Sequence, residues 1–375
     1  MTSPSTYSIW LRNSNNVVID YVDNAKLVSM HMARNVYGDG ALDMVLTAQT
    51  KWAALGQDAR VEVWRTSMGG VTSLLTDTQW LITSYSKNVD SVGGKTYHLT
   101  AEPFVSLCSR RIVAYAAAAA QASKTDHADD MMKAIMRENY GSLATDTTRD
   151  MSSYLTIADD TSAAPSITLA FSWRNVKDVL LDIASASAAD ETTPTRLYFD
   201  MPYDTTTQKP VFTTYVGQPG DDHTRDAAEP VVFSYMRDNT ANAQLLYDYT
   251  SEKNYVYGLG QGEETARTLV EVSLPPRMAA SIWNRREASQ DARQCSTTDG
   301  ITAKALAALW DARPVIAIKG MLLSTPATEF GTHWGLGDLV TAELDTVAQD
   351  SIVESVALSV ENGVEQITGT ARSVE

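Results

Sequence analysis

The sequence is poor in the features that mark secreted and membrane-spanning proteins. Its only cysteines, Cys108 and Cys295, are far apart, and a chain of 375 residues needs no disulfide for stability. We therefore expect buried, reduced thiols. No apolar run approaches the roughly 20 residues that cross a bilayer, and the N-terminus has no basic stretch followed by an apolar core. These absences predict a chain that is made and folded in a cytoplasm, with no membrane span.

Positive charge is also scarce. Thirty Lys and Arg residues stand against 46 Asp and Glu residues, which gives a net charge of −16 at pH 7. Such a surface repels phosphate groups and anionic lipids, so it disfavours tight nucleic-acid binding. A negative wall does suit a passage through which DNA slides without sticking, although charge alone does not establish that role.

Motifs for nucleotide binding and hydrolysis are missing. The sequence has no Gly-Lys-Ser/Thr phosphate loop, no Gly-x-Ser-x-Gly elbow and no His-Glu-x-x-His. The segment Gly258-Leu-Gly-Gln-Gly262 is followed by an alternating, strand-like stretch, so we interpret it as a turn between strands. Carboxylate pairs carry little information where 46 acidic residues are present. We expect no catalytic residues.

Metal-binding patterns are equally weak. The five histidines are dozens of residues apart and lack the short ligand spacing of common zinc motifs: His31, His98, His127, His223 and His333. The acidic segment Asp126-His-Ala-Asp-Asp130 is explained by the preference of helix N-termini for negative charge. We expect no metal and no cofactor.

Apolar and aromatic residues, in contrast, are plentiful. Hydrophobic residues make up 44% of the chain and charged residues 20%, which is ordinary for a globular protein with a large core. The eight tryptophans and 16 tyrosines lie mostly in alternating segments. We favour core and subunit interface for these rings over a glycan-binding surface, because both settings use their large area.

The first part of the chain has the pattern of short strands. Apolar residues alternate with polar ones at residues 7–11, 42–46, 61–65 and 97–100, and Gly, Asn and Asp separate these runs. Turns are predicted at residues 37–40 and at residues 92–95. We predict a first β-barrel-like domain over residues 1–106.

A helix-rich insertion over residues 107–194 comes next. Alanine dominates residues 110–122 and predicts one helix. A second follows the cap candidate Thr125-Asp-His127, carries methionines on one face and ends at Gly141. A third is predicted from about Trp173 to Ala184, with apolar residues at three- and four-residue spacing.

Strand patterns return in the remainder of the chain. We predict a second β-barrel-like domain from residues 195–250 plus 313–375, and a mixed α/β insertion at 251–312 whose helix spans about 302–312. The fold class expected is mainly β (α+β), with two barrel-like domains of the kind found in tail tubes and helix-containing insertions. No repeat of 20–50 residues is visible.

Three segments in the C-terminal third resemble a known family: Tyr257-Gly-Leu-Gly-Gln-Gly-Glu-Glu-Thr-Ala-Arg267, Asn284-Arg-Arg-Glu-Ala-Ser-Gln-Asp-Ala-Arg293 and His333-Trp-Gly-Leu-Gly-Asp-Leu-Val-Thr341. Weaker agreement is found at 33–40, 110–115 and 129–136, and only the alanine stretch departs from the pattern. The family is that of tail hub proteins from long-tailed, non-contractile phages, which are related in fold to the baseplate hubs of contractile tails.

This resemblance implies a structural protein of the virion tail tip. It implies a homotrimer whose barrel-like units form a sixfold ring around the end of the DNA channel. The implied partners are a distal tail or tail tube protein, a tape measure protein and a tail fibre or tip protein; DNA passes through without specific binding. Within this family, Gly335, Gly337 and Asp338 would form a tight structural turn that opens a strand.

Two basic pairs are candidates for subunit contacts. We expect Arg110 with Arg111, and Arg285 with Arg286, to meet acidic residues at such contacts, because arginine binds carboxylates in a fixed geometry. Two other functions compete with the tail hub. A carbohydrate-binding adhesin predicts an exposed aromatic cluster, and a cell-wall hydrolase predicts lysis of host walls.

Overall fold

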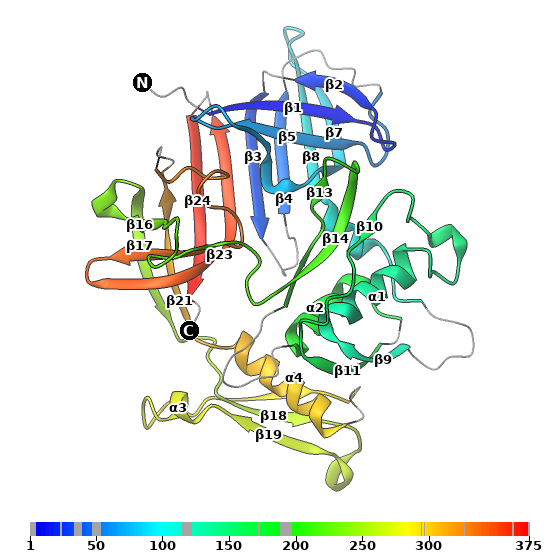
Figure 1. Ribbon diagram of the computed structural model, residues 1–375, viewed down its shortest axis with the longest axis vertical. Helices are drawn as coiled ribbons and strands as arrows, with labels where there is room; N and C mark the ends of the chain where they lie inside the picture. Colours follow the sequence, from blue (N-terminus) through cyan, green and yellow to red (C-terminus); the bar gives the residue numbers. More distant parts are fainter. Residues whose placement is uncertain are drawn as a thin grey trace.

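The fold is built mainly from β-strands, as the alternating apolar pattern predicts (Figure 1). The computed structural model describes residues 5–22, 25–33, 40–46, 54–114, 122–171, 173–187, 197–293, 295, 297–323, 325, 327–361 and 364–373. The turn predicted at residues 37–40 lies mostly outside these residues, as does the alanine stretch at 116–120.

One sheet of 15 strands dominates the fold. Its path runs through β17 (Thr240–Asp248), β21 (Val315–Leu322), β24 (Val364–Ser373), β23 (Val347–Glu361), β3 (Ala25–Ala33), β4 (Gly40–Leu46), β8 (Lys95–Pro103), β7 (Trp80–Val89), β5 (Arg60–Thr66), β1 (Thr6–Arg12) and β2 (Val18–Val22). Four shorter strands attach to this path: β6 (Thr72–Leu74), β15 (Asp222–His223), β16 (Val232–Ser234) and β22 (Leu339–Leu344).

This sheet corrects the expectation of two separate barrels. Strand β23 pairs with β22 through its first residues and with β3 through Ser355 to Glu361, so strands from both predicted β domains share one ladder. At 15 residues, β23 is long enough to make both pairings. Among the described strands the sheet path ends at β17 and β2, and no closed barrel is formed. The mainly β class with additional helices is confirmed.

Alternating side chains explain why the sheet has a buried face. In β1, Ile9 and Leu11 are 1% exposed, and in β5 Val61 and Val63 are fully buried. These residues join one hydrophobic cluster with Trp80, Leu99, Val356 and Leu358, among others. Every second side chain of a strand faces the same side of the sheet. Strands from the first and last parts of the chain therefore pack against the same core.

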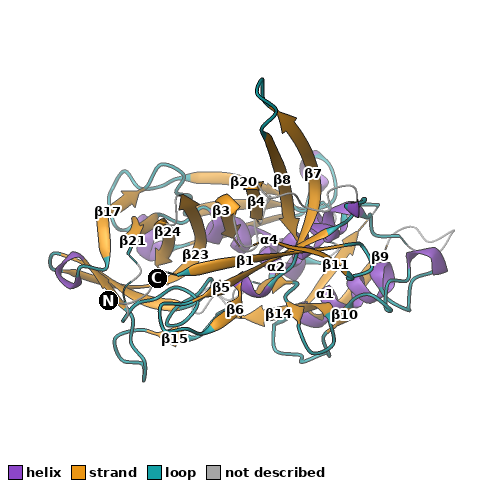
Figure 2. Ribbon diagram, turned by 90° about the horizontal axis from the view of Figure 1, so that it is seen from above, coloured by secondary structure: helices purple, strands orange, loops and turns teal. Residues whose placement is uncertain are grey.

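The β7–β8 hairpin extends well beyond this core (Figure 2). Its turn spans residues 90–94 and so overlaps the predicted residues 92–95, with Gly93 at φ 86°. Residues 83–96 are exposed on both faces, and Val92 at the tip is 89% exposed. The hairpin is thus a two-stranded arm attached to the sheet at its base.

The helical region follows the prediction only in part. After the 3-10 helix η3 (Phe104–Arg110), the chain is not helical at residues 111–114, and β9 (Ala122–His127) begins at Ala122. The described ends of the predicted helix at 110–122 are therefore not α-helical. The alanine-rich composition is overridden at its end because residues 122–127 pair with β11 (Ser166–Phe171).

The other two helices exist, with shifted starts. Helix α1 (Ala128–Tyr140) ends at Gly141 as predicted, but Thr125 lies in β9 and provides no cap. Helix α2 (Val176–Ala186) begins after Asn175, whose side chain accepts a hydrogen bond from the Lys177 backbone. Both helices present apolar faces to one buried cluster.

That cluster also contains residues from beyond the predicted insertion. Leu197, Phe199 and Phe212 pack with the helices, on a small sheet of β10 (Thr156–Ile157), β12 (Leu197–Asp200), β13 (Tyr203–Asp204) and β14 (Lys209–Val216). The sequence boundary at residue 194 therefore does not coincide with a boundary between these cores. The four-part domain division itself stays a prediction.

A smaller body occupies the end of the molecule opposite β1 and β2 (Figure 1). It consists of β18 (Tyr255–Leu259), β19 (Leu269–Ser273), α3 (Pro275–Met278), β20 (Glu287–Asp291) and α4 (Thr298–Asp311). The glycine-rich segment at 258–262 connects β18 to β19, so its interpretation as a turn between strands is confirmed. Buried Val256, Leu306 and Leu309 form its core.

The remaining short elements are 3-10 helices: η2 (Leu75–Asp77), η4 (Thr147–Arg149), η5 (Tyr235–Arg237) and η6 (Glu264–Ala266). Among the residues described, no helix has the length and apolar character that a bilayer span requires. Cys108 and Cys295 are both buried, and neither is part of a disulfide.

Candidate functional site

The segment before β22 makes a tight turn. Gly337 has φ 95°, a left-handed conformation that side chains rarely adopt. Its N–H donates to the Val353 carbonyl (2.9 Å), and Val353 N–H donates to the Asp338 carbonyl (2.9 Å). The Asp338 carboxylate accepts a hydrogen bond from Gly335 N–H (2.5 Å). The turn therefore fixes where β22 begins to pair with β23.

Asp338 also fastens a distant segment to this turn. Its second carboxylate oxygen accepts from Asp221 N–H (2.9 Å), and His223 Nε2 lies 3.7 Å from the first. Gly220 is needed for the approach, since a Cβ there would lie 2.7 Å from the backbone of Gly337 and Asp338. Our sequence analysis missed Gly220. The signal was the preceding Pro219, because Pro-Gly marks a turn.

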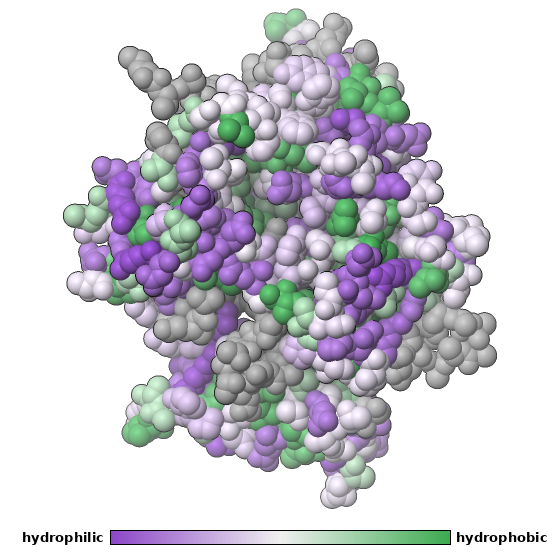
Figure 3. Space-filling model, viewed as in Figure 1, coloured by the Kyte–Doolittle hydropathy of each residue, from purple (hydrophilic) through white to green (hydrophobic). Residues whose placement is uncertain are grey.

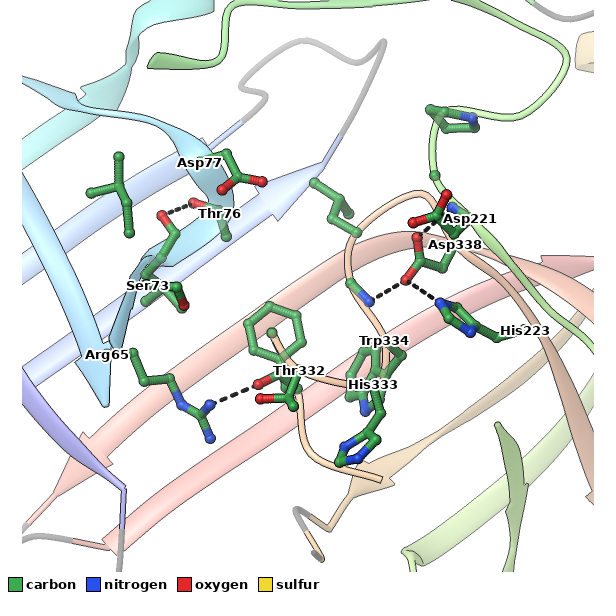
Figure 4. A pocket seen from close by; sticks show the side chains of 18 of the residues that line it. Arg65, Ser73, Thr76, Asp77, Asp221, His223, Thr332, His333, Trp334 and Asp338 are labelled. Carbon is green, nitrogen blue, oxygen red and sulfur yellow. Dashed lines mark hydrogen bonds and ion pairs between the residues drawn. The ribbon is translucent and has the colours of Figure 1, made fainter. Parts of the chain in front are cut away.

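A cavity of about 380 Å³ opens beside this turn (Figure 4). Four parts of the chain form it: Arg65 in β5, the β6–η2 segment, residues 215–223 and residues 330–338. Asp221, His223 and Asp338 lie on one side of the view and Arg65, Ser73 and Asp77 on the other. The predicted turn is thus part of a pocket that only the folded chain assembles.

Arg65 forms a buried ionic wall of this pocket. Its guanidinium is 3% exposed and bonds to Glu365 (2.9 and 3.0 Å), to Glu329 (3.1 Å) and to the Phe330 carbonyl (2.7 Å). Tyr7 donates a hydrogen bond to Glu365. Buried charges are tolerated when they are paired and hydrogen-bonded in this way.

Arg65 stays charged and Tyr7 stays neutral in this wall. Burial lowers the pKa of Arg65, but the hydrogen bond and charge of Glu365 raise it more, so it is raised overall. Burial and the charge of Glu365 raise the pKa of Tyr7, which stays neutral. Glu365 therefore accepts bonds from a cation and a phenol at once. The cluster is suited to joining chain segments.

Two histidines border the pocket, and each is held by backbone groups. His333 Nδ1 accepts a hydrogen bond from Glu329 N–H (3.0 Å), while His223 Nδ1 lies 2.9 Å from the Glu229 carbonyl. Among the described residues, no three or more His, Cys, Asp or Glu side chains are placed to hold a metal ion. The polar groups of the pocket position segments of the chain.

The first predicted basic pair is used within the chain. Arg110 pairs with Asp58 (2.6 Å) on the surface. Arg111 binds two backbone carbonyls, of Asn139 (2.6 Å) and Arg149 (2.5 Å), and lies over the Tyr140 ring. Burial lowers the pKa of Arg111. Arg111 thus joins η3 to α1 through carbonyls of its own chain, and its expected pairing with acidic residues at a subunit contact stays a prediction.

The second basic pair lies in the smaller body. Arg285 is exposed, pairs with Glu287 (2.6 Å) and stacks 4.1 Å from the Tyr255 ring. Arg286 donates to the Tyr249 carbonyl. The two pairs are not brought together with the Gly335–Asp338 turn. Their role at a subunit contact stays a prediction.

Comparison with solved structures places this fold among tail proteins. The 43 kDa tail protein of prophage MuSo2 from Shewanella oneidensis has a TM-score of 0.63 and 10% identity, covering 99% of this chain and 98% of that one. The tail protein from Neisseria meningitidis MC58 has a TM-score of 0.60 and 12% identity, with 98% and 97% covered. These similarities establish the fold.

A third solved structure with a similar fold comes from a secretion system. The Escherichia coli c3393 protein, a type VI secretion component described as similar to T4 tail proteins gp27 and gp5, has a TM-score of 0.51 and 10% identity. The match covers 93% of this chain and 73% of that one. No curated protein matches the sequence.

The family assignment rests on the sequence itself. A family model described as Siphovirus ReqiPepy6 Gp37-like protein matches residues 9–370, which is nearly the whole chain. Together with the fold of phage tail proteins and gp27-like baseplate hub components, this match identifies the chain as a phage tail protein of the Siphovirus ReqiPepy6 Gp37-like family.

Proposed function

We propose that this protein is the structural hub of a phage tail tip. In this role it joins the tail tube or distal tail protein to the tip and fibres and forms the end of the DNA channel. The observation that carries the proposal is the fold, which agrees with tail proteins over 98–99% of this chain. The tape measure protein, held inside the tube, is the third proposed neighbour.

Assembly as a homotrimer follows from the same proposal. The main sheet path ends at β17 and β2, and an edge strand presents unpaired backbone groups that favour association. In a closed ring each copy covers an edge of the next, and no edge is left for uncontrolled growth. In the ring, the two β regions that share the main sheet of each chain act as two like units, which gives six around a threefold axis.

The acidic surface suits the proposed channel. With a net charge of −16 per chain, a threefold ring repels the phosphates of passing DNA. Both arginine pairs are engaged by groups of their own chain, so they are not held ready for phosphate. DNA therefore passes without being specifically bound.

Electron microscopy of intact particles labelled with antibody against this chain tests the location. Label at the end of the tail opposite the capsid supports the proposal. Label on the capsid or along the whole tube contradicts it. Quantitative mass measurement of isolated tail tips then tests the stoichiometry, where three copies are expected and six or twelve would exclude the single trimer.

A further inference from the structure

The sheet of the smaller body has one covered face and one open face. Helix α4 packs on the first: a Cβ on Gly258 would lie 2.8 Å from the Ile301 side chain, and Val256 and Val272 are buried in one cluster with Leu306. Helix α4 also contacts α2, so it lies between this sheet and the rest of the molecule (Figure 1). The opposite face of the sheet is therefore the open face.

Alternation along β18 places an aromatic column on the open face. Tyr255, Tyr257 and Leu259 alternate with the residues that face α4, and all three are partly exposed. The centroids of the two tyrosine rings are 5.1 Å apart. Leu269 of β19 pairs with Leu259 and is 52% exposed. At about 3.3 Å per residue the column is about 13 Å long, which suits a short linear oligomer.

Polar side chains border the column on both sides. The residues in register with it are Glu271 and Ser273 in β19, and Glu287, Ser289 and Asp291 in β20. All of these except Ser273 are exposed. In Figure 3, the lower end of the molecule, where β18 and β19 lie in Figure 1, shows hydrophilic and hydrophobic residues side by side. The open face thus combines a narrow apolar strip with hydrogen-bonding groups along its edges.

One end of the column is held by its own chain. Arg285 lies over the Tyr255 ring, 4.1 Å from its centroid, and pairs with Glu287 (2.6 Å). The Tyr255 hydroxyl donates a hydrogen bond to Glu271. These contacts fix the column before any ligand arrives, and a fixed surface lowers the entropy cost of binding.

The charge and composition of the open face favour one class of ligand. Strands β18, β19 and β20 contain three acidic residues and no Lys or Arg, so they repel phosphate groups. Protein interfaces are depleted of Glu, Asp and Ser at their centre, whereas here these residues flank the rings directly. A sugar fits both features, because its C–H groups pack on aromatic rings and its hydroxyls donate charge-assisted hydrogen bonds to carboxylates.

We propose that the open face of this sheet binds a neutral oligosaccharide. Its sugar rings stack on Tyr257 and Leu259, with Leu269 beside them, and its hydroxyls bond to Glu271 and Ser289. This activity goes beyond the joining role of the hub and does not depend on the number of copies in the tail tip.

Binding of the purified full-length chain to a glycan array tests the activity. The array carries neutral oligomers of glucose, galactose, mannose, rhamnose and N-acetylglucosamine, together with sulfated and phosphorylated glycans. We expect binding to at least one neutral oligomer and no binding to the anionic set. Absence of neutral binding, or binding confined to the anionic glycans, would overturn the proposal and leave the hub function standing.

Variants of the column test the location of the site by calorimetry with the neutral oligomer that binds best. Tyr257→Ala should weaken binding at least about tenfold, because a stacking ring is lost. Tyr257→Phe should retain most of the affinity, since it keeps the ring. Leu269→Asp, at an exposed position outside the core, should weaken binding as well. The control Tyr154→Ala, at a tyrosine that is 57% exposed elsewhere, should not change it.

Melting temperatures of all variants establish that they are folded. Unchanged affinity in both Tyr257→Ala and Leu269→Asp would overturn the site. Unchanged glycan binding combined with weaker self-association of Tyr257→Ala would also overturn it, and would assign the open face to a protein contact.

Discussion

Two buried charge clusters hold the protein together over different distances along the chain. Arg65 bonds to Glu365, 300 residues away, and to Glu329, 264 residues away. In the helical region, Lys133 lies 3.5 Å from Asp129 and 3.4 Å from Asp130, within one turn of α1. Asp129 and Asp130 accept hydrogen bonds from residues 161–164, only about thirty residues on.

The difference shows what each cluster can stabilise. The Arg65 cluster joins β5 to the loop before β22 and to β24, so the main sheet depends on it. The cluster at Asp129 fixes one loop on the start of α1. We expect loss of the first to promote global unfolding and loss of the second to release a local segment, since stability is not uniform across a structure.

The largest effect is expected from Arg65→Met. Removing the guanidinium leaves Glu329 and Glu365 without their cation, and breaking a buried ion pair costs roughly 3–5 kcal/mol. Urea unfolding should report this loss. Adding Glu329→Gln and Glu365→Gln should recover part of it, because the orphaned charges are then removed. A loss below about 1 kcal/mol for Arg65→Met would mean that the cluster does not hold the sheet.

A smaller effect is expected from Asp129→Asn. The carboxylate accepts from Thr161 and from the Ala164 backbone, and weakening these buried bonds costs roughly 1–3 kcal/mol. Hydrogen exchange should show faster opening at residues 161–164, with β5 and β24 unchanged. Uniformly faster exchange over the main sheet would contradict the separation of the two clusters.

The same carboxylate predicts a pH dependence. Burial raises the pKa of Asp129, but hydrogen bonds from Thr161, Ala164 and Ala163 and the charge of Lys133 lower it more, to about 2. Its ordinary value is about 3.9. The depressed folded-state pKa adds stability that is complete above the ordinary value and is lost as pH falls through about 2. Denaturation between pH 2 and pH 5 should show this slope, and Asp129→Asn should flatten it.

Gly337→Val tests a contact of intermediate distance along the chain. The turn that contains Gly337 binds the backbone of Asp221 through Asp338, and these two residues are 117 positions apart. A β-branched side chain is strained at φ 95°, so we expect a loss of about 1 kcal/mol or more. Gly335→Ala is the matched control, since its Cβ would meet Asp338 at an ordinary 3.6 Å and its φ is not positive. Equal melting temperatures for the two variants would show that a side chain at residue 337 does not strain the turn.

The smallest effect is expected from Arg285→Ala. Arg285 pairs with Glu287 two residues on, and both side chains are exposed. Exposed ion pairs of this kind contribute little, because water screens the charges. We expect no measurable shift of the urea midpoint. A clear shift of the urea midpoint of the purified chain would mean that Arg285 stabilises the folded chain itself. It would then argue against a role for Arg285 at a subunit contact.

Local patterns predicted many elements correctly. The strand pattern predicted at residues 61–65 lies within β5, and Gly141 follows the last turn of α1. The turn after β18 was also predicted, because glycines followed by an alternating run indicate a hairpin-like connection. These signals succeed because they lie within a few residues of the feature they specify.

Other features depended on partners that are remote in the sequence. Residues 122–127 form a strand because β11 pairs with them, despite the alanine-rich stretch before them. Gly220 was missed because its constraint comes from Gly337 and Asp338 across a gap of more than a hundred residues. Arg65 gave no signal, since nothing near it in the sequence identifies Glu329 or Glu365 as its partners.

The sequence by itself determined the mainly β class, the family resemblance and the acidic net charge. Each of these follows from composition or from a short run of residues. Only the tertiary structure decided that β23 joins both halves in one open sheet, and that segments far apart in the sequence enclose the pocket. Strand pairing and buried charge pairs depend on which surfaces meet in space. The alternating pattern of a strand specifies which of its faces is buried, but it does not specify which strand lies beside it.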